Sequence, residues 1–200
     1  MCGRFYVDDD TAKEIERTIR KVDEQLKRQQ RTGDIYPTQT AAVISADQKE
    51  MAVTEKRWGF PGFGSTRVLI NARAETALTK RMFQDSLLRR RMIIPASGFY
   101  EWNQEKEKVI FTHKGEPGQK AAVLYMAGFY QKFDGEDRFV ILTTDANESV
   151  RPVHHRMPLV LETQELEDWL WNDSRLEQLL YKKPGALEGR VAFEQQRLLL

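Results

Sequence analysis

Residues 92–102 read Met92-Ile93-Ile94-Pro95-Ala96-Ser97-Gly98-Phe99-Tyr100-Glu101-Trp102. The apolar run before Ala96 and the aromatic run after Gly98 are both typical of β-strands. A similar aromatic segment, Gly128-Phe129-Tyr130-Gln131, ends a later apolar run. We interpret these two aromatic segments as similar strands in one sheet, which predicts a β-rich core.

The same patterns extend outward in both directions from this stretch. Further strands are predicted at residues 3–7, 42–46, 51–58, 67–71, 109–112, 123–130, 139–144, 159–161 and 190–193. Helices are predicted from Asp8 to about Gln30, where apolar residues recur every three or four positions, and over 74–88, 165–171 and 176–181. Connections are expected at 33–38, at 57–64 with exposed rings, and at 151–158. The order predicts one α+β domain over residues 1–200, with a largely antiparallel sheet curled into a barrel and helices around it.

The composition limits the classes of function that the chain could have. The chain has 31 Lys and Arg against 30 Asp and Glu, so only a local basic patch would indicate nucleic-acid binding. One cysteine excludes an internal disulfide framework and a cysteine-based zinc site, and three histidines leave little for any metal. We therefore expect no cofactor. No apolar run resembles a signal segment or reaches membrane-spanning length, which favours a cytoplasmic protein.

Cys2, the only cysteine, directly follows the initiator Met1. A small second residue lets an aminopeptidase remove the methionine, which leaves an α-amine and a thiol on adjacent carbons. The α-amine has a pKa of about 8, against about 10.4 for lysine, so more of it is unprotonated at neutral pH. Such a pair condenses with an aldehyde to a Schiff base, which the thiol closes to a thiazolidine. The alternative is a small buried apolar residue.

Glu101 and His154 are the candidate proton-transfer groups. Glu101 shares a strand face with Phe99, and burial there would raise its pKa and suit it to general acid–base work. Alternatively it lies at a solvent edge or pairs with an arginine. Of the adjacent His154 and His155, at most one is expected to face a site, because neighbouring strand residues point to opposite faces. A surface histidine is the alternative reading.

Several arginines lie near aromatic or amide side chains. Asn71 and Arg73 share one face of a strand, which suits a sugar hydroxyl and a phosphate or a structural pair. Arginine also alternates with aromatic rings in Arg4-Phe5-Tyr6 and Arg57-Trp58, the pattern of single-stranded nucleic-acid binding. Glycines and Pro61 around Trp58 and Phe60 favour exposed rings over core ones. Residues 89–91, three arginines, are interpreted as a solvated run at a helix end.

Seven motifs together resemble the SRAP (SOS response-associated peptidase) family over roughly residues 1–180. They are Met1-Cys2-Gly3-Arg4-Phe5, Pro37-Thr38-Gln39, Arg57-Trp58-Gly59, Asn71-Ala72-Arg73-Ala74-Glu75-Thr76, Arg91–Pro95 with Gly98–Trp102, Thr143-Thr144-Asp145-Ala146-Asn147 and His154-His155-Arg156-Met157-Pro158. The chain departs from the family where Gly33-Asp34 replaces the usual Tyr-Asn and Tyr36 precedes Pro37. The loop after Gly59 is also short and phenylalanine-rich, and the C-terminal tail lacks the usual pattern.

The resemblance implies a protein that crosslinks covalently to abasic sites in single-stranded DNA. Cys2 would supply the amine and the thiol, Glu101 the acid–base group, His154 help in imine chemistry and crosslink reversal, and Asn71 the positioning of the sugar and N-terminus. The implied DNA contacts are Arg4, Pro37, Trp58, Arg73, Thr144 and Arg156. A monomer is expected, at the nucleoid when engaged with DNA. Weak abasic-site lyase activity would be a side reaction, and the peptidase label would refer to autocatalytic or aminopeptidase removal of Met1.

Two other functions stay open at this stage. One is a cysteine-nucleophile peptidase or amidase that uses Cys2, His154 and either Glu101 or Asn71. The other is a non-catalytic module that binds single-stranded DNA and in which Cys2 is structural.

Overall fold

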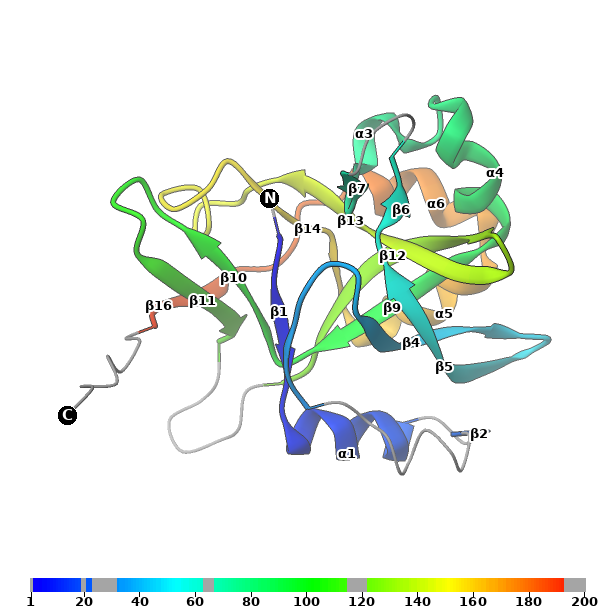
Figure 1. The fold of residues 1–200 in the computed structure, drawn as a ribbon, viewed down its shortest axis with the longest axis horizontal. Coiled ribbons are helices and arrows are strands. Elements are labelled where there is room, and N and C mark those ends of the chain that lie inside the picture. The colour runs from blue at the N-terminus through cyan, green and yellow to red at the C-terminus, as the bar shows by residue number, and fades with distance from the viewer. Residues whose placement is uncertain (1, 19–20, 23–31, 63–66, 115–121, 193–200) are drawn as a thin grey trace.

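The structure is a computed structural model that describes residues 2–18, 21–22, 32–62, 67–114 and 122–192 (Figure 1). Its helical elements are α1 (Asp9–Thr18), α3 (Ala74–Ala77), α4 (Arg81–Arg89), η1 (Thr163–Glu165), α5 (Leu166–Trp171) and α6 (Asp173–Leu180). Its strands are β1 (Phe5–Val7), β2 (Lys21–Val22), β3 (Gly33–Ile35), β4 (Thr40–Asp47), β5 (Glu50–Trp58), β6 (Phe60–Pro61), β7 (Val68–Leu69), β8 (Asn71–Arg73), β9 (Arg91–Ala96), β10 (Gly98–Trp102), β11 (Lys108–His113), β12 (Leu124–Phe133), β13 (Glu136–Asp145), β14 (Arg156–Pro158), β15 (Val160–Leu161) and β16 (Leu187–Val191).

Five long strands form a closed barrel. They follow the order β13-β12-β9-β4-β5, and β5 returns to β13 to close the ring. The closing pair is parallel, with Trp58 opposite Phe139, whereas the other four pairs are antiparallel. The expected α+β fold with a largely antiparallel, barrel-like sheet is therefore confirmed.

A second sheet, in the order β16-β11-β10-β1-β3, packs beside the barrel and is antiparallel throughout. Alternation along β9 divides the core in two, because neighbouring strand residues point to opposite faces. Met92 and Ile94 join Phe5, Phe99 and other apolar residues of the second sheet in one buried cluster. Ile93 belongs to the other cluster, which packs under the helices.

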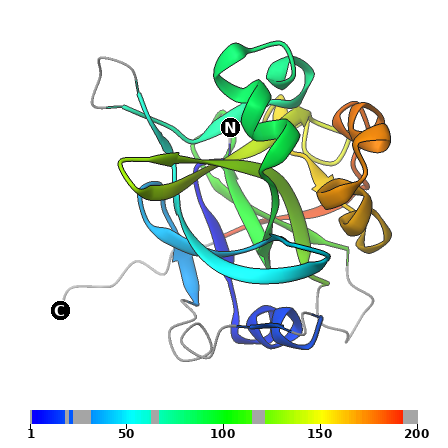
Figure 2. The same cartoon turned by 90° about the vertical axis from the view of Figure 1, so that its right-hand side faces the viewer.

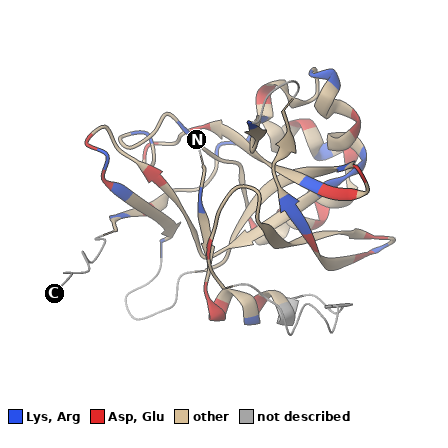
Figure 3. Ribbon diagram, in the orientation of Figure 1, with Lys and Arg blue, Asp and Glu red and all other residues tan. Residues whose placement is uncertain are grey.

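The helices lie around the barrel rather than inside it. Figure 2 shows α1 below it, α3 and α4 above it, and α5 and α6 on one side. Within the described ranges no helix is long and apolar enough to cross a membrane. Basic and acidic segments are interspersed along the described ribbon in Figure 3, in keeping with the balanced composition.

The two similar aromatic segments lie in different sheets, so the expectation of one sheet is wrong. Gly98 begins β10 in the second sheet, whereas Gly128 lies within β12 in the barrel. Their likeness has a packing cause. A Cβ on Gly98 would lie 2.6 Å from the Phe111 carbonyl oxygen, and one on Gly128 would lie 2.6 Å from that of Val140. Each glycine permits a close approach to the neighbouring strand.

Several predicted boundaries also differ. The first helix ends at Thr18, and residues 21–22 form a strand parallel to β5, so the expected helical position of Val22 is wrong. The part of that helix predicted over residues 23–30 lies outside the described residues. The predicted helix over 74–88 is two helices, because the Thr76 carbonyl accepts the N–H groups of Thr79 and Lys80 and ends the first.

Two predicted connections contain strands. Residues 33–35 pair with β1, and residues 156–158 pair with β13. Arg91 is also not solvated. Its guanidinium is buried and donates to the Trp169 carbonyl at 2.5 Å and to Asp173 at 2.6 Å, so it joins β9 to the start of α6.

Candidate functional site

Cys2 is enclosed by the fold, with an exposed fraction of 0%. Its thiol points to the Arg4 carbonyl oxygen at 3.8 Å, and its own carbonyl accepts a 2.9 Å hydrogen bond from Nδ2 of Asn71. Asn71 is buried in β8, where it pairs with Ile141 of β13. Its Oδ1 is buried and has no hydrogen-bond partner among the described residues. Residue 2 is therefore bound to β8 at the edge of the barrel. The Oδ1 atom of Asn71 lies beside it as an unused hydrogen-bond acceptor among the described residues.

The strand register brings Glu101 toward the same place. Phe5 pairs with Phe99, and the N–H of Tyr100 donates to the Arg4 carbonyl at 2.9 Å. Continued two residues beyond the Phe5–Phe99 pair, this register sets Gly3 opposite Glu101. Glu101 is 3% exposed, and burial raises the pKa of its carboxyl. The predicted buried carboxyl with a raised pKa is present.

The thiol and the carboxyl are electrostatic neighbours. Burial is the main cause that raises the pKa of the Cys2 thiol far above its ordinary value, and the negative charge of Glu101 adds to it. The thiol is therefore protonated at neutral pH. A reactive cysteine of the protease type has the opposite environment, with a positive neighbour and a lowered pKa.

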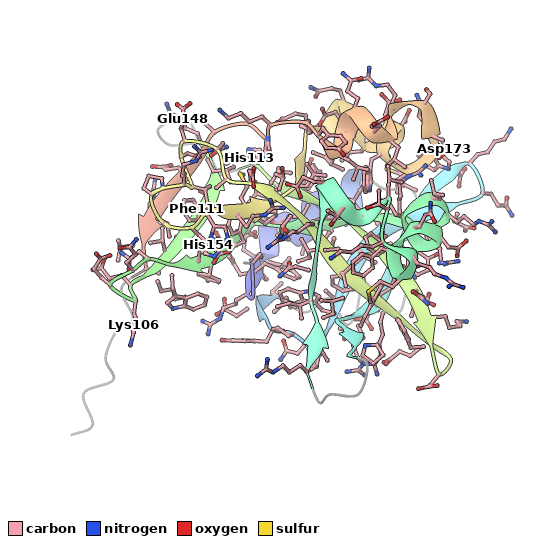
Figure 4. All side chains as sticks on the ribbon, turned by 90° about the horizontal axis from the view of Figure 1, so that it is seen from above. Lys106, Phe111, His113, Glu148, His154 and Asp173 are labelled. Atoms are coloured by element: carbon pink, nitrogen blue, oxygen red, sulfur yellow. The ribbon has the colours of Figure 1, made fainter. Side chains whose placement is uncertain are left out.

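The two histidines stack on each other before β14. Their ring centroids lie 4.5 Å apart at an angle of 27°. Nδ1 of His154 accepts the N–H of Arg156 at 3.0 Å, and burial lowers the pKa of His154, which keeps its ring neutral at pH 7. Figure 4 shows His154 on the loop that leads into β14. His155 is exposed, so of the two histidines His154 is the more enclosed by the fold.

Arg4 lies in a cluster of aromatic rings, which we call the Arg4 cluster: Arg4, Asp34, Tyr36, Tyr100 and Trp102. The guanidinium carbon of Arg4 lies 4.4 Å from the ring centroid of Tyr36, 5.6 Å from that of Tyr100 and 5.5 Å from that of Trp102. Its Nη1 lies 3.3 Å from the Asp34 carboxylate. The alternation of arginine and aromatic residues pointed to Arg4, but the rings around it are Tyr36, Tyr100 and Trp102 rather than its neighbours Phe5 and Tyr6. Asp34 was missed because β3 was interpreted as a turn.

Trp58 is a core residue, so its expected exposure and base stacking are contradicted. Its exposed fraction is 0%, its ring lies between those of Phe5 and Phe139, and Nε1 donates to the Ile70 carbonyl at 2.9 Å. Phe60 is likewise buried against other phenylalanines. The barrel closure explains this, because Trp58 and its neighbour Arg57 are the β5 residues that pair with β13.

Arg156 has partners that leave little room for a phosphate. Its guanidinium is buried and binds both oxygens of Glu75, at 2.7 and 2.9 Å, and one of Asp145 at 2.6 Å. It also donates to the Thr143 carbonyl at 2.6 Å. These bonds join α3 to the end of β13. A role of Arg156 in phosphate binding stays a prediction, and it would require a phosphate to replace one of the two carboxylates.

The remaining predicted DNA contacts differ in accessibility. Arg73 is exposed at the end of β8 and forms no ion pair with any other described residue. Pro37 is half-buried in the turn before β4, and Thr144 is buried where β13 pairs with Met157. No cluster of acidic, cysteine and histidine side chains in the described ranges could hold a metal. Of these three side chains, that of Arg73 is the most exposed.

Relatives of known name share much of the chain. The protein is 30% identical to the abasic site processing protein YedK of Escherichia coli, over 85% of this chain and 79% of that one. It is 31% identical to the abasic site processing protein YoqW of Bacillus subtilis, over 85% of this chain and 80% of that one. The match to the abasic site processing protein HMCES of Gallus gallus, at 28%, spans 52% of that longer chain.

Solved structures share the fold. A protein from Bacteroides thetaiotaomicron superposes with a TM-score of 0.75 at 24% identity, over 95% of this chain and 91% of that one. A protein from Bordetella bronchiseptica superposes with a TM-score of 0.77 at 21% sequence identity, over 96% of this chain and 100% of that one. The model of the family described as SOS response associated peptidase (SRAP) matches residues 1–191. The chain therefore belongs to the SRAP family.

Proposed function

We propose that this protein processes abasic sites in single-stranded DNA by capturing the sugar aldehyde covalently at Cys2. The names of the relatives, each an abasic site processing protein, support the substrate class. The observation that carries the proposal is the hydrogen bond from Asn71 to the Cys2 carbonyl. It holds residue 2 in a built site beside a buried carboxyl, where an ordinary chain end would be loose.

The chemistry begins with the α-amine of Cys2. Hydrolysis of the Met1–Cys2 peptide bond frees this amine. The amine adds to the C1′ aldehyde of the ring-opened sugar to give a carbinolamine, which loses one water to give an imine. The thiol sulfur then bonds to the imine carbon while the thiol proton passes to the nitrogen, and a thiazolidine results. No electrons enter or leave, so no redox cofactor is required.

The raised pKa values support an order for these steps. The Cys2 thiol is protonated, so the amine attacks first and the thiol follows. Glu101, whose pKa burial raises, can donate a proton to the departing hydroxyl of the carbinolamine and take one back. Neutral His154 can move a proton at the imine nitrogen and assist reversal.

DNA is held by the exposed Arg73 and by Arg4, with Pro37 and Thr144 near the lesion. If the imine persists without thiol closure, β-elimination at the sugar cleaves the strand, which gives weak lyase activity. We expect the protein to act as a monomer in the cytoplasm. A cysteine peptidase is disfavoured by the raised pKa of the thiol, which lowers the thiolate fraction such chemistry needs.

A denaturing gel tests the proposal. Wild-type protein shown by mass spectrometry to begin at Cys2 is incubated with single-stranded DNA that holds one abasic site, and with the same strand undamaged. We expect a heat-stable shifted band with the abasic strand and none with Cys2→Ala. If Cys2→Ala binds this DNA as well as wild type and neither forms a band, the non-catalytic DNA-binding module is correct instead.

A further inference from the structure

Asp34 places a carboxylate directly beside the guanidinium of Arg4. One carboxylate oxygen lies 3.3 Å from Nη1 of Arg4 and 3.4 Å from the Tyr36 hydroxyl, and the other accepts the Tyr100 hydroxyl at 2.9 Å. Asp34 is set there by β3, which pairs with β1 in a register that places it opposite Tyr6. A carboxylate with hydrogen bonds from two tyrosines has a defined position beside the arginine.

The rings of the Arg4 cluster limit the directions from which Arg4 can be approached. The guanidinium lies closest to the Tyr36 ring, at 4.4 Å, and Nε is buried without a hydrogen-bond partner among the described residues. The Arg4 side chain is 20% exposed and that of Asp34 is 30% exposed. Both charges can therefore be reached by solvent, and an incoming phosphate would meet the two together.

We propose that Asp34 masks Arg4 and lowers the affinity of this protein for undamaged single-stranded DNA. The inference rests on the proposed function, since it concerns the binding of the same DNA. A phosphate that bonds Arg4 comes close to the Asp34 carboxylate, and like charges side by side oppose binding. The mask makes retention of DNA depend more on the covalent reaction at Cys2 and less on general phosphate attraction.

The chain offers a matched control for this idea. Asp34→Asn removes one negative charge but keeps an amide oxygen that can accept the Tyr100 hydroxyl. Asp85→Asn also removes one negative charge from an ion pair with arginine, but on α4, outside the Arg4 cluster. Any difference between the two variants therefore reports the place of the charge rather than the net charge of the protein.

The test is fluorescence anisotropy with a labelled, undamaged single strand over a range of salt concentrations. Exposed ion pairs are worth up to about 1 kcal/mol, so we expect Asp34→Asn to bind roughly three- to fivefold more tightly, and Asp85→Asn less than twofold. The salt dependence of Asp34→Asn should steepen by roughly 0.7 in the log–log slope, because one more phosphate is neutralised. In an Arg4→Gln background Asp34→Asn should have no effect.

Other results would overturn the inference. Asp34→Asn that binds like Asp85→Asn would mean that Asp34 does not mask Arg4. Asp34→Asn that binds more weakly than wild type would mean that Asp34 holds Arg4 in place for DNA. Tyr100→Phe, which frees Asp34 from one hydrogen bond but keeps its charge, should not tighten binding, and tightening would point to geometry instead. Thermal unfolding of each variant identifies any that fails to fold.

A competition assay separates this inference from the proposed function. Crosslinking of wild type to an abasic strand is measured with excess undamaged strand present. Asp34→Asn should be inhibited at a competitor concentration several-fold lower than wild type. If wild type crosslinks but both proteins show equal inhibition, only the mask is wrong. If wild type neither crosslinks nor binds, the proposed function itself has failed.

Discussion

Asn71 donates its side-chain amide to the carbonyl oxygen of Cys2 at 2.9 Å and so joins β8 to the chain ahead of β1. This bond holds residue 2 by its backbone carbonyl, so it does not engage the amine and the thiol that the proposed reaction uses. Its donor is an N–H group, which an aspartate lacks. The geometry therefore separates the roles of the Asn71 nitrogen and oxygen.

Replacing Asn71 should slow capture far more than it destabilises the fold. Loss of a reacting group's position can cost on the order of a hundredfold in rate, whereas one neutral hydrogen bond contributes about 1 kcal/mol to stability. We expect both Asn71→Ala and the isosteric Asn71→Asp to lower the single-turnover crosslinking rate at least tenfold. A wild-type rate in Asn71→Asp would mean that the bond to Cys2 is not used.

Glu101 should make stability depend on pH. Its pKa is higher in the folded protein than in the unfolded chain. As pH rises, the unfolded chain therefore loses this proton before the folded protein does. This contribution is fully present below the ordinary glutamate pKa of about 4.3 and is lost as pH rises through the folded value. Relative to wild type, Glu101→Gln should gain melting temperature as pH increases from about 4 to 8. A constant difference over that range would argue against the raised pKa.

The Cys2 thiol should resist alkylation in the folded protein. It is fully buried and its raised pKa leaves little thiolate at neutral pH. We expect iodoacetamide to modify it at least tenfold more slowly than a free cysteine, with the difference abolished in denaturant, because the thiolate is the reactive form. Equal rates in native and unfolded protein, measured by intact mass, would place the thiol at the surface.

Arg156 and Arg73 should differ in what they stabilise. Arg156 is buried with four hydrogen bonds to Glu75, Asp145 and Thr143, so Arg156→Gln should cost about 2–3 kcal/mol of unfolding free energy. The exposed Arg73→Gln should change stability by less than about 0.5 kcal/mol but weaken DNA binding. Denaturant unfolding and anisotropy measure both quantities on both variants. An Arg156→Gln variant with wild-type stability and reduced DNA affinity would instead show that Arg156 binds a phosphate.

Local patterns predicted most strands, since alternation and turn residues mark them directly. Strands β4 and β5 were predicted within a few residues, as were β11, β12 and β13. What failed was long-range pairing. β3 and β14 are short and are strands because β1 and β13 pair with them, which no local pattern records.

The same limit applied to the candidate site. Cys2, Asn71, Glu101 and His154 were identified from motifs, and the structure adds the burial and register that relate the first three. Trp58 was misplaced because its flanking glycine suggests exposure, whereas Gly59 has a positive φ of 111° and its N–H bonds the Phe139 carbonyl at the barrel closure. The partners of Arg156 lie far from it in sequence, so only the fold could show them.

The central claim is that the α-amine of Cys2 makes the first bond to the abasic site. The most direct measurement uses the full chain behind a leader that a site-specific protease removes to leave Cys2 at the N-terminus. Samples before and after cleavage are incubated with the abasic single strand and analysed by intact mass. The account predicts an adduct of protein plus DNA minus one water only after cleavage. An equal yield of this adduct before cleavage would contradict it.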